Sequence, residues 1–152
     1  MKKLFAVALL ALSSLSAAAA LVSPAAGAAD AKPSALAVGA VAPDFTLPDA
    51  DGKQHSLASL KGKSGTVIIF VATKCPVSNA YTARMQKLAD DYRARGVNVV
   101  GINSTASEPA AEVKSHAAEK GLAFTILKDA GHVVADRLDA QVTPEAYFLD
   151  AA

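Results

Sequence analysis

Apolar and polar positions alternate along this chain in a way that predicts strands and helices in turn. A continuous apolar and β-branched run over residues 66–72 predicts a central strand buried on both faces, as in a parallel sheet. After a short corner, apolar residues recur at helical spacing and predict a helix that stops at Gly96. The inward positions of this helix are expected at Tyr81, Met85, Leu88 and Tyr92.

The rest of the chain continues this alternation. The other predicted elements are a hairpin over residues 45–56, a helical turn at 56–60, strands at 97–103, 122–127 and 145–149, and helices at 107–120 and 132–139. Ser107 is expected to cap its helix, with Glu108 and Pro109 in the first turn and Gly121 at the end. Val134 and Leu138 are expected to point inward from the last helix. This order indicates an α/β sheet with helices on both faces.

The N-terminal residues have the pattern of a secretory signal peptide. Lys2 and Lys3 precede an apolar stretch over residues 4–12, and Ala26-Gly27-Ala28 offers an A-x-A cleavage site. The serines and alanines after the apolar stretch argue against a helix that spans a membrane. No stable membrane association is therefore expected after cleavage. The predicted division is a signal peptide at 1–28, a flexible linker at 29–37 and one domain at 38–152.

Charge and cysteine content narrow the classes of function. Cleavage after Ala28 would leave 13 basic against 14 acidic residues, which gives no reason to expect nucleic acid as a partner. Export implies an oxidising compartment that is periplasmic or extracellular, yet Cys75 is the only cysteine and cannot form an intrachain disulfide. Its thiol is therefore either inert and buried or reactive.

Cys75 lies at the predicted corner between the central strand and the following helix. A helix start carries unpaired N–H groups and the positive end of the helix dipole, both of which favour a thiolate. Pro76 suits the first helical turn, where its missing N–H costs nothing. Lys74 adds a neighbouring positive charge that would lower the pKa of the thiol.

Six short motifs occur in this order along the chain: Gly39-Ala-Val-Ala-Pro-Asp-Phe45, Phe70-Val-Ala-Thr-Lys-Cys75, Lys74-Cys-Pro-Val-Ser78, Gly101-Ile-Asn-Ser104, Thr143-Pro144 and Phe148-Leu-Asp150. Together they resemble the redoxin group of the thioredoxin-like superfamily, which contains TlpA-like oxidoreductases and peroxiredoxins (AhpC/TSA). The resemblance implies a thioredoxin-like α/β fold with a central mixed sheet and flanking helices, here without the usual C-terminal strand and helix. It also implies that Thr143-Pro144 contains a cis proline against Cys75 and shapes the substrate surface.

The chain departs from this group in ways that bear on mechanism. The second cysteine of a C-x-x-C motif is replaced by Ser78, whose hydroxyl can donate a hydrogen bond to the Cys75 sulfur but cannot resolve a mixed disulfide. The threonine that a peroxiredoxin places three residues before its cysteine is Ala72 here, with Thr73 one position late. Pro144 stands where a peroxiredoxin has an arginine.

Other polar side chains have simpler interpretations. His55, His116 and His132 lack ligand spacing, so we expect surface histidines, and no metal or other cofactor. Asp49 and Asp51 are expected in a turn, without the rest of a calcium-binding loop, and Glu145 is expected to face solvent rather than the thiol.

The expected function is that of an exported single-cysteine redoxin with thiol-based antioxidant or oxidoreductase activity. Cys75 would attack a disulfide or a peroxide, supported by Thr73, Lys74, Pro76 and Ser78, and an external thiol or a disulfide-bearing protein would be the partner. The alternative is a non-catalytic module of the same fold that binds peptides or proteins near Thr143-Pro144. A structural role for a buried Cys75 is a third reading.

Overall fold

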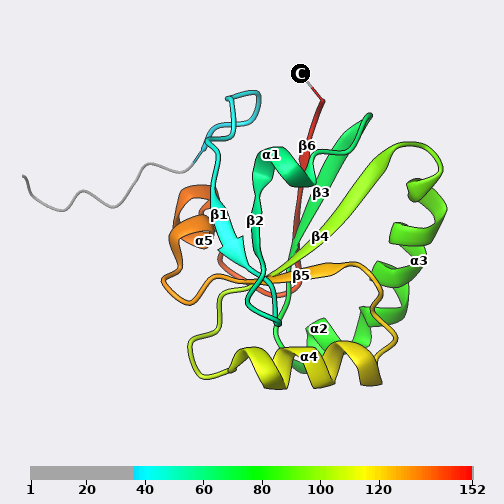
Figure 1. Cartoon of the computed structure of the whole chain (residues 1–152), viewed down its shortest axis with the longest axis vertical. Coiled ribbons are helices and arrows are strands. Elements are labelled where there is room, and N and C mark those ends of the chain that lie inside the picture. Colours follow the sequence, from blue (N-terminus) through cyan, green and yellow to red (C-terminus); the bar gives the residue numbers. More distant parts are fainter. Residues whose placement is uncertain (1–35, 152) are drawn as a thin grey trace, which may run out of the picture. The chain divides into compact units, whose positions relative to one another are not determined.

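The computed structural model describes residues 36–151, which contain a four-stranded mixed sheet and a separate two-stranded hairpin (Figure 1). The sheet has the order β5-β4-β3-β6, with Gly65–Phe70 as β3, Val97–Asn103 as β4, Thr125–Lys128 as β5 and Glu145–Leu149 as β6. β3 pairs with β4 and β4 with β5 in parallel, whereas β6 runs antiparallel to β3. The mixed α/β sheet is therefore confirmed, while the predicted signal peptide lies outside the described residues.

Short helices and the hairpin complete the described part of the chain. The helices are α1 (Leu57–Leu60), α2 (Pro76–Ala80), α3 (Thr82–Arg93), α4 (Ala110–Glu119) and α5 (Val133–Leu138), and the hairpin strands are β1 (Thr46–Pro48) and β2 (Gln54–Ser56). Ser56 caps α1 by accepting a hydrogen bond from the Ser59 N–H at 3.1 Å. Among residues 36–151, no helix has both the length and the apolar character needed to cross a bilayer.

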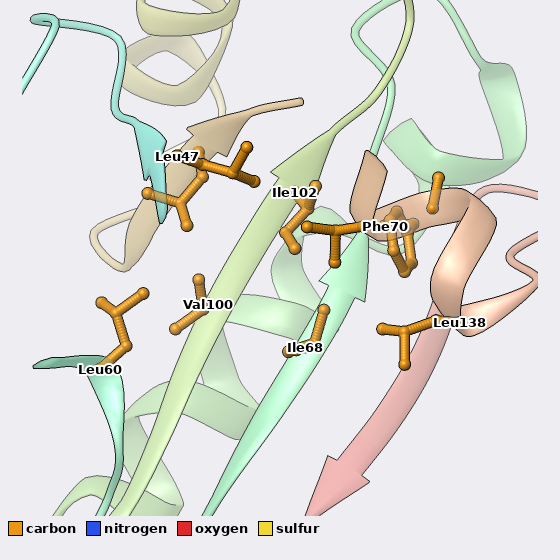
Figure 2. Packing of buried hydrophobic residues seen from close by; sticks show 10 residues of the cluster. Leu47, Leu60, Ile68, Phe70, Val100, Ile102 and Leu138 are labelled. Atoms are coloured by element: carbon orange, nitrogen blue, oxygen red, sulfur yellow. The ribbon is translucent and has the colours of Figure 1, made fainter. Parts of the chain in front are cut away.

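The alternation of side chains along the strands divides the core between the two faces of the sheet. Ile68 and Phe70 of β3 point to one face, where they pack with the hairpin, α1 and α5 (Figure 2). Ile69 points to the opposite face, where it packs with Met85 of α3 and Val113 of α4. Helices therefore cover both faces, as expected for this fold class.

The topology brings four chain segments to one edge of the sheet. The three parallel strands end there, and β6 begins there because Glu145 is the register partner of Phe70. The segments that follow Phe70, Asn103 and Lys128, and the segment that precedes Glu145, therefore lie near one another. Cys75 and Thr143 both belong to these segments.

The helix after Cys75 differs from the prediction because it is broken. α2 ends at Ala80 and α3 starts at Thr82. Met85 is buried as predicted and Leu88 is partly buried against the core, but the fully buried neighbours are Thr82 and Ala89, one position after the predicted Tyr81 and Leu88. The buried residues of α3 are Thr82, Met85 and Ala89, and Tyr81 is 42% exposed with the Arg84 guanidinium over its ring. The prediction that Tyr81 is a core residue is wrong.

The start of α4 also differs from the prediction. The residue at its N-cap is Pro109, with extended backbone, so Ser107 does not cap this helix. A proline disfavours helical backbone at the residue before it. Pro109 therefore explains why Glu108 does not lie in the first turn of α4. The Glu108 side chain is instead only 1% exposed and points into the protein.

Candidate functional site

Cys75 lies where the chain passes from β3 into α2. It is the N-cap residue of α2, with extended backbone, and Pro76 opens the helix as the sequence predicts. The cysteine is half-buried, so its sulfur is not sealed in the core. This placement leaves the thiol reachable from solvent at the edge where four segments meet.

Two segments far apart in sequence contact the sulfur. The Ser78 N–H donates to Cys75 Sγ at 3.4 Å, and the Cys75 thiol donates to the Thr143 carbonyl at 3.3 Å. The peptide bond between Thr143 and Pro144 is cis. The predicted proximity of Cys75 to Thr143 is thus present in the structure.

The pKa of the Cys75 thiol is lowered from its ordinary value. The side-chain hydrogen bond of Thr143 is the largest cause, followed by the Ser78 N–H, while partial burial opposes ionisation. The Val77 N–H also lowers this pKa, and the charge of Glu108 raises it slightly. Thr143 acts in two ways, because its carbonyl holds the proton on the neutral thiol and its side chain favours the thiolate.

The loop that leads into Cys75 is held by hydrogen bonds on several sides. Glu108 accepts the N–H of Thr73 at 2.8 Å and the N–H of Lys74 at 2.9 Å. Asn79 donates to the Thr73 carbonyl at 2.8 Å, and the Thr73 hydroxyl donates to Glu112 at 2.5 Å. The backbone immediately before the cysteine is therefore fixed by side chains from α2 and from the α4 region.

A buried polar chain supports Glu108 from behind. Asn103, at the end of β4 and 0% exposed, donates to Glu108 at 2.6 Å and receives a hydrogen bond from the Lys128 ammonium at 2.6 Å. Burial opposes ionisation of Glu108, but the hydrogen bonds from Thr73, Lys74 and Asn103 outweigh it and lower its pKa. Burial likewise lowers the pKa of Lys128.

Two of the supporting residues act differently from the prediction. The Lys74 ammonium pairs with Glu112 at 3.1 Å, and the causes that lower the pKa of Cys75 are hydrogen bonds from other residues. The hydroxyl of buried Ser78 accepts the Ala72 N–H at 3.3 Å, so the backbone of Ser78 rather than its hydroxyl bonds the sulfur. A local sequence pattern locates these residues but does not determine the direction of their side chains.

Glu145 is half-buried, and its carboxylate binds groups of its own turn rather than the thiol. Its carboxylate accepts the N–H of Gln141 at 2.7 Å, the N–H of Val142 at 3.2 Å and the hydroxyl of Tyr147 at 2.8 Å. Burial and the bond to Glu145 raise the pKa of Tyr147 to about 12. Glu145 therefore braces the turn that carries Thr143.

His132 is exposed as expected, but the other two histidines are half-buried and bound to polar neighbours rather than on the surface. His55 pairs with Asp49 at 2.8 Å, and His116 contacts Asn79 at 2.5 Å. The Asp49 carboxylate also accepts the N–H groups of Asp51 and Lys53, as expected for a turn. No group of three histidine, cysteine or acidic residues suited to a metal ion occurs in residues 36–151.

Sequence reasoning missed Glu108, Asn103 and Lys128. Asn103 and Lys128 end neighbouring parallel strands, and polar residues at such strand ends meet at one edge of a sheet; that signal was available. For Glu108 the local signal is the proline that follows it, since the loop amides that it binds are 34 and 35 residues away.

Comparisons with known proteins place the chain among known redox proteins. The sequence model of the AhpC/TSA family matches residues 38–152. The chain is 32% identical over 116 residues to the thiol-disulfide oxidoreductase ResA of Geobacillus thermodenitrificans. The aligned region covers 76% of this chain and 65% of that protein. The chain is also 34% identical over 96 residues to the chloroplastic peroxiredoxin Q of Triticum aestivum. This second aligned region covers 63% of this chain and 43% of that protein. The chain thus spans just under two thirds of the length of the first of these relatives.

A solved structure has a fold similar to that of this chain. The secreted disulfide oxidoreductase of Mycobacterium tuberculosis that is homologous to E. coli DsbE superposes with a TM-score of 0.59 at 25% identity. The match covers 71% of this chain and 84% of that structure. The thioredoxin-like fold predicted from the motifs is confirmed.

Proposed function

Because the chain belongs to the AhpC/TSA family, we propose that it is an exported redoxin that works with the single thiol of Cys75. Its relatives are a thiol-disulfide oxidoreductase and a peroxiredoxin, both of which act through cysteine chemistry. The observation that carries the proposal is the environment of Cys75 Sγ. The sulfur is half-exposed at a helix start, accepts the Ser78 N–H and lies against Thr143.

The reaction that these contacts favour is thiol–disulfide exchange. The Cys75 thiolate attacks one sulfur of a disulfide, a mixed disulfide forms on Cys75, and the other sulfur leaves as a thiolate that takes up a proton. An external thiolate then attacks the sulfur of the bound group, so that Cys75 leaves as a thiolate. The substrate sulfurs end in one free thiol and one disulfide with the external thiol, so no other oxidant or reductant is needed.

A peroxide is the second candidate substrate. The Cys75 thiolate would attack one peroxide oxygen, form a sulfenate and release an alcohol or water, and external thiols would reduce the sulfenate. The groups that would activate the peroxide are engaged elsewhere, since the Thr73 hydroxyl donates to Glu112 and residue 72 is alanine. We therefore expect disulfides to react faster than peroxides.

Export is part of the proposal. Residues 1–28 have the pattern of a signal peptide, and the DsbE-homologous structure belongs to a secreted protein. The mature protein would then begin at Ala29 and meet its thiol reductant or disulfide-bearing protein outside the cytoplasm. Mass spectrometry of the protein recovered after secretion in a bacterial host tests this, and an uncut leader would contradict it.

The test of Cys75 combines alkylation with mass spectrometry. The rate of iodoacetamide alkylation across pH should give a midpoint below the value of a free cysteine, about 8.5. Limiting glutathione disulfide should add one glutathione to the wild type, and this adduct should disappear with excess thiol. Hydrogen peroxide should modify Cys75 more slowly, and Cys75→Ser should give no adduct. A midpoint at or above the free value would contradict a reactive thiol.

A non-catalytic binding module is the alternative, favoured by the replacement of the second cysteine with Ser78. If this alternative holds, an extended peptide should bind equally well to the wild type and to Cys75→Ser. Under the redoxin proposal, capture of a peptide that carries a disulfide should be covalent and should be lost in Cys75→Ser.

A further inference from the structure

One buried carboxylate lies directly behind the active-site loop without touching the sulfur. We propose that Glu108 is a positioning residue, which holds the backbone of Thr73 and Lys74 so that Cys75 stays against Thr143. The inference rests on the proposed function, since it concerns the reactivity of the Cys75 thiol. It adds a residue that the cysteine motif does not contain.

The contacts of Glu108 are directed at the backbone of the loop. Its Oε1 accepts the Lys74 N–H at 2.9 Å, and its Oε2 accepts the Thr73 N–H at 2.8 Å and the Asn103 amide at 2.6 Å. These are charge-assisted bonds in a buried place, where a lost partner is costly. Thr73 and Lys74 are the two residues before Cys75, so their backbone sets where the N-cap of α2 begins.

The neighbourhood of Glu108 is built to keep its carboxylate in place. Asn103 links it to the Lys128 ammonium of β5, and Lys128 also donates to the Thr105 carbonyl at 2.5 Å. The other charged groups around it are Glu112 on α4 and Lys74 on the loop, which pair with each other. Glu108 itself is 1% exposed, so water does not replace any of its partners.

Glu108 can change the pKa of the Cys75 thiol in two opposite directions, one through its charge and one through the position of the loop. The negative charge of Glu108 raises the pKa of the Cys75 thiol. This charge effect is smaller than the hydrogen bonds and the burial that also act on the thiol. The contact with Thr143 is the largest cause and lowers that pKa. If Glu108 positions the loop, its loss should weaken the Thr143 contact and raise the midpoint of alkylation, whereas loss of charge alone would lower it.

The decisive experiment is alkylation of full-length Glu108→Gln by iodoacetamide between pH 5 and 10. Glutamine keeps the volume but presents only one acceptor oxygen, so it cannot accept all three donors that Glu108 binds. The midpoint should rise and the rate at pH 7 should fall by at least about threefold. A midpoint that is unchanged or lower would overturn the proposal.

Two further variants separate position from charge. Glu112→Gln removes a neighbouring negative charge, keeps a carbonyl oxygen that can accept the Thr73 hydroxyl, and leaves the loop amides bound to Glu108, so its midpoint should not rise. Glu108→Asp keeps the charge and withdraws the carboxylate by one methylene, so its midpoint should rise as in Glu108→Gln. A midpoint that rises equally in Glu112→Gln, or stays unchanged in Glu108→Asp, would overturn a positioning role.

A measurement on the wild type guards against variants that fail to fold. Circular dichroism shows whether each variant is folded, and amide hydrogen exchange of the wild type by NMR reports the loop directly. The Thr73 and Lys74 amides should exchange slowly if Glu108 holds them, and fast exchange of both would overturn the proposal. Because these readouts use alkylation and exchange, they remain interpretable even if Cys75 proves unable to turn over disulfides.

Discussion

The ionisation of Cys75 depends most on Thr143, the residue that the fold brings to the sulfur from 68 positions away. Its side chain favours the thiolate, and its carbonyl accepts the proton of the neutral thiol. Thr143→Val removes the first of these contacts and keeps the second. The alkylation midpoint of Cys75 should therefore rise in this variant, while Thr143→Ser, which keeps the hydroxyl, should stay near the wild type.

The same contact links pH to stability. A thiol whose pKa is lowered by folding stabilises the protein fully above its unfolded pKa, about 8.5, and this contribution disappears as the pH falls through the folded value. Unfolding by urea at pH 9 and pH 5 should therefore show a larger advantage of the wild type over Cys75→Ser at pH 9. Thr143→Val should reduce that difference, and an equal difference at both pH values would contradict a lowered thiol pKa.

Ser78 offers a test of why a single thiol needs an external partner. Its N–H bonds the Cys75 sulfur, so a sulfur at this position would be near enough to form the disulfide of a C-x-x-C motif. Ser78→Cys should lose the mass of two hydrogens on mild oxidation and should release a bound glutathione without added thiol. Ser78→Ala should do neither, and a Ser78→Cys protein that retains the glutathione adduct would contradict this geometry.

At the scale of single residues, sequence reasoning placed the candidate reactive cysteine better than the side chains that support it. The placement of Cys75 and Pro76 was predicted because a helix start is a local feature, whereas Thr143 was predicted from the resemblance to a known family. The orientation of the Lys74 ammonium toward Glu112 was not, because it depends on where α4 packs. Glu108 was missed for the same reason.

The first turn of α5 is capped by a buried side chain from the preceding loop. Asp129, which is 1% exposed, accepts the N–H groups of Val133, Val134 and Ala135 and the hydroxyl of Ser104. These bonds satisfy the first turn of a helix that contributes to the core. They also join the segment after β5 to the segment after β4, next to the site.

Removal of this cap should destabilise the protein. Asp129→Ala should lower the free energy of unfolding by about 2 kcal/mol, because it leaves several buried donors without an acceptor. The exposed Asp136→Ala on the same helix should cost less than about 1 kcal/mol. Urea unfolding measures both, and equal losses would show that the cap of α5 is not important for stability.

At the scale of elements, sequence patterns placed α5 within one residue at each end but placed the start of β5 at residue 122 instead of Thr125. β6 spans residues 145–149 as predicted, because a short apolar strand after a proline has clear limits. The break at Tyr81 and the start of α4 at Ala110 were not predicted. Helical spacing is continuous across the Tyr81 break, and the signal from Pro109 was outweighed by an apparent serine cap.

At the scale of the whole domain, the sheet keeps the two halves of the core apart and brings the site together at one edge. The order β5-β4-β3-β6 follows from two parallel crossovers and one antiparallel return. It places the ends of three strands beside Thr143. The pattern of strands and helices was sufficient to predict the fold class, but the contact between Cys75 and Thr143 required the resemblance to a known family.

The separation of the core into two faces predicts how core substitutions combine. Ile68 belongs to the face shown in Figure 2 and Ile126 to the opposite face, whereas Val100 is the register partner of Ile68 on the same face. Each isoleucine-to-valine change should cost about 1 kcal/mol. In urea unfolding, Ile68→Val and Ile126→Val should add within about 0.5 kcal/mol, since no cavity is shared.

Ile68→Val with Val100→Ala should instead deviate from additivity by more than about 0.5 kcal/mol, because both enlarge the same space between β3 and β4 side chains. The separation into two faces would be contradicted if the pair on opposite faces coupled as strongly as the pair on one face. In that case strain would pass through the sheet itself. Substitutions in the core under α5 would then also be expected to change the alkylation midpoint of Cys75.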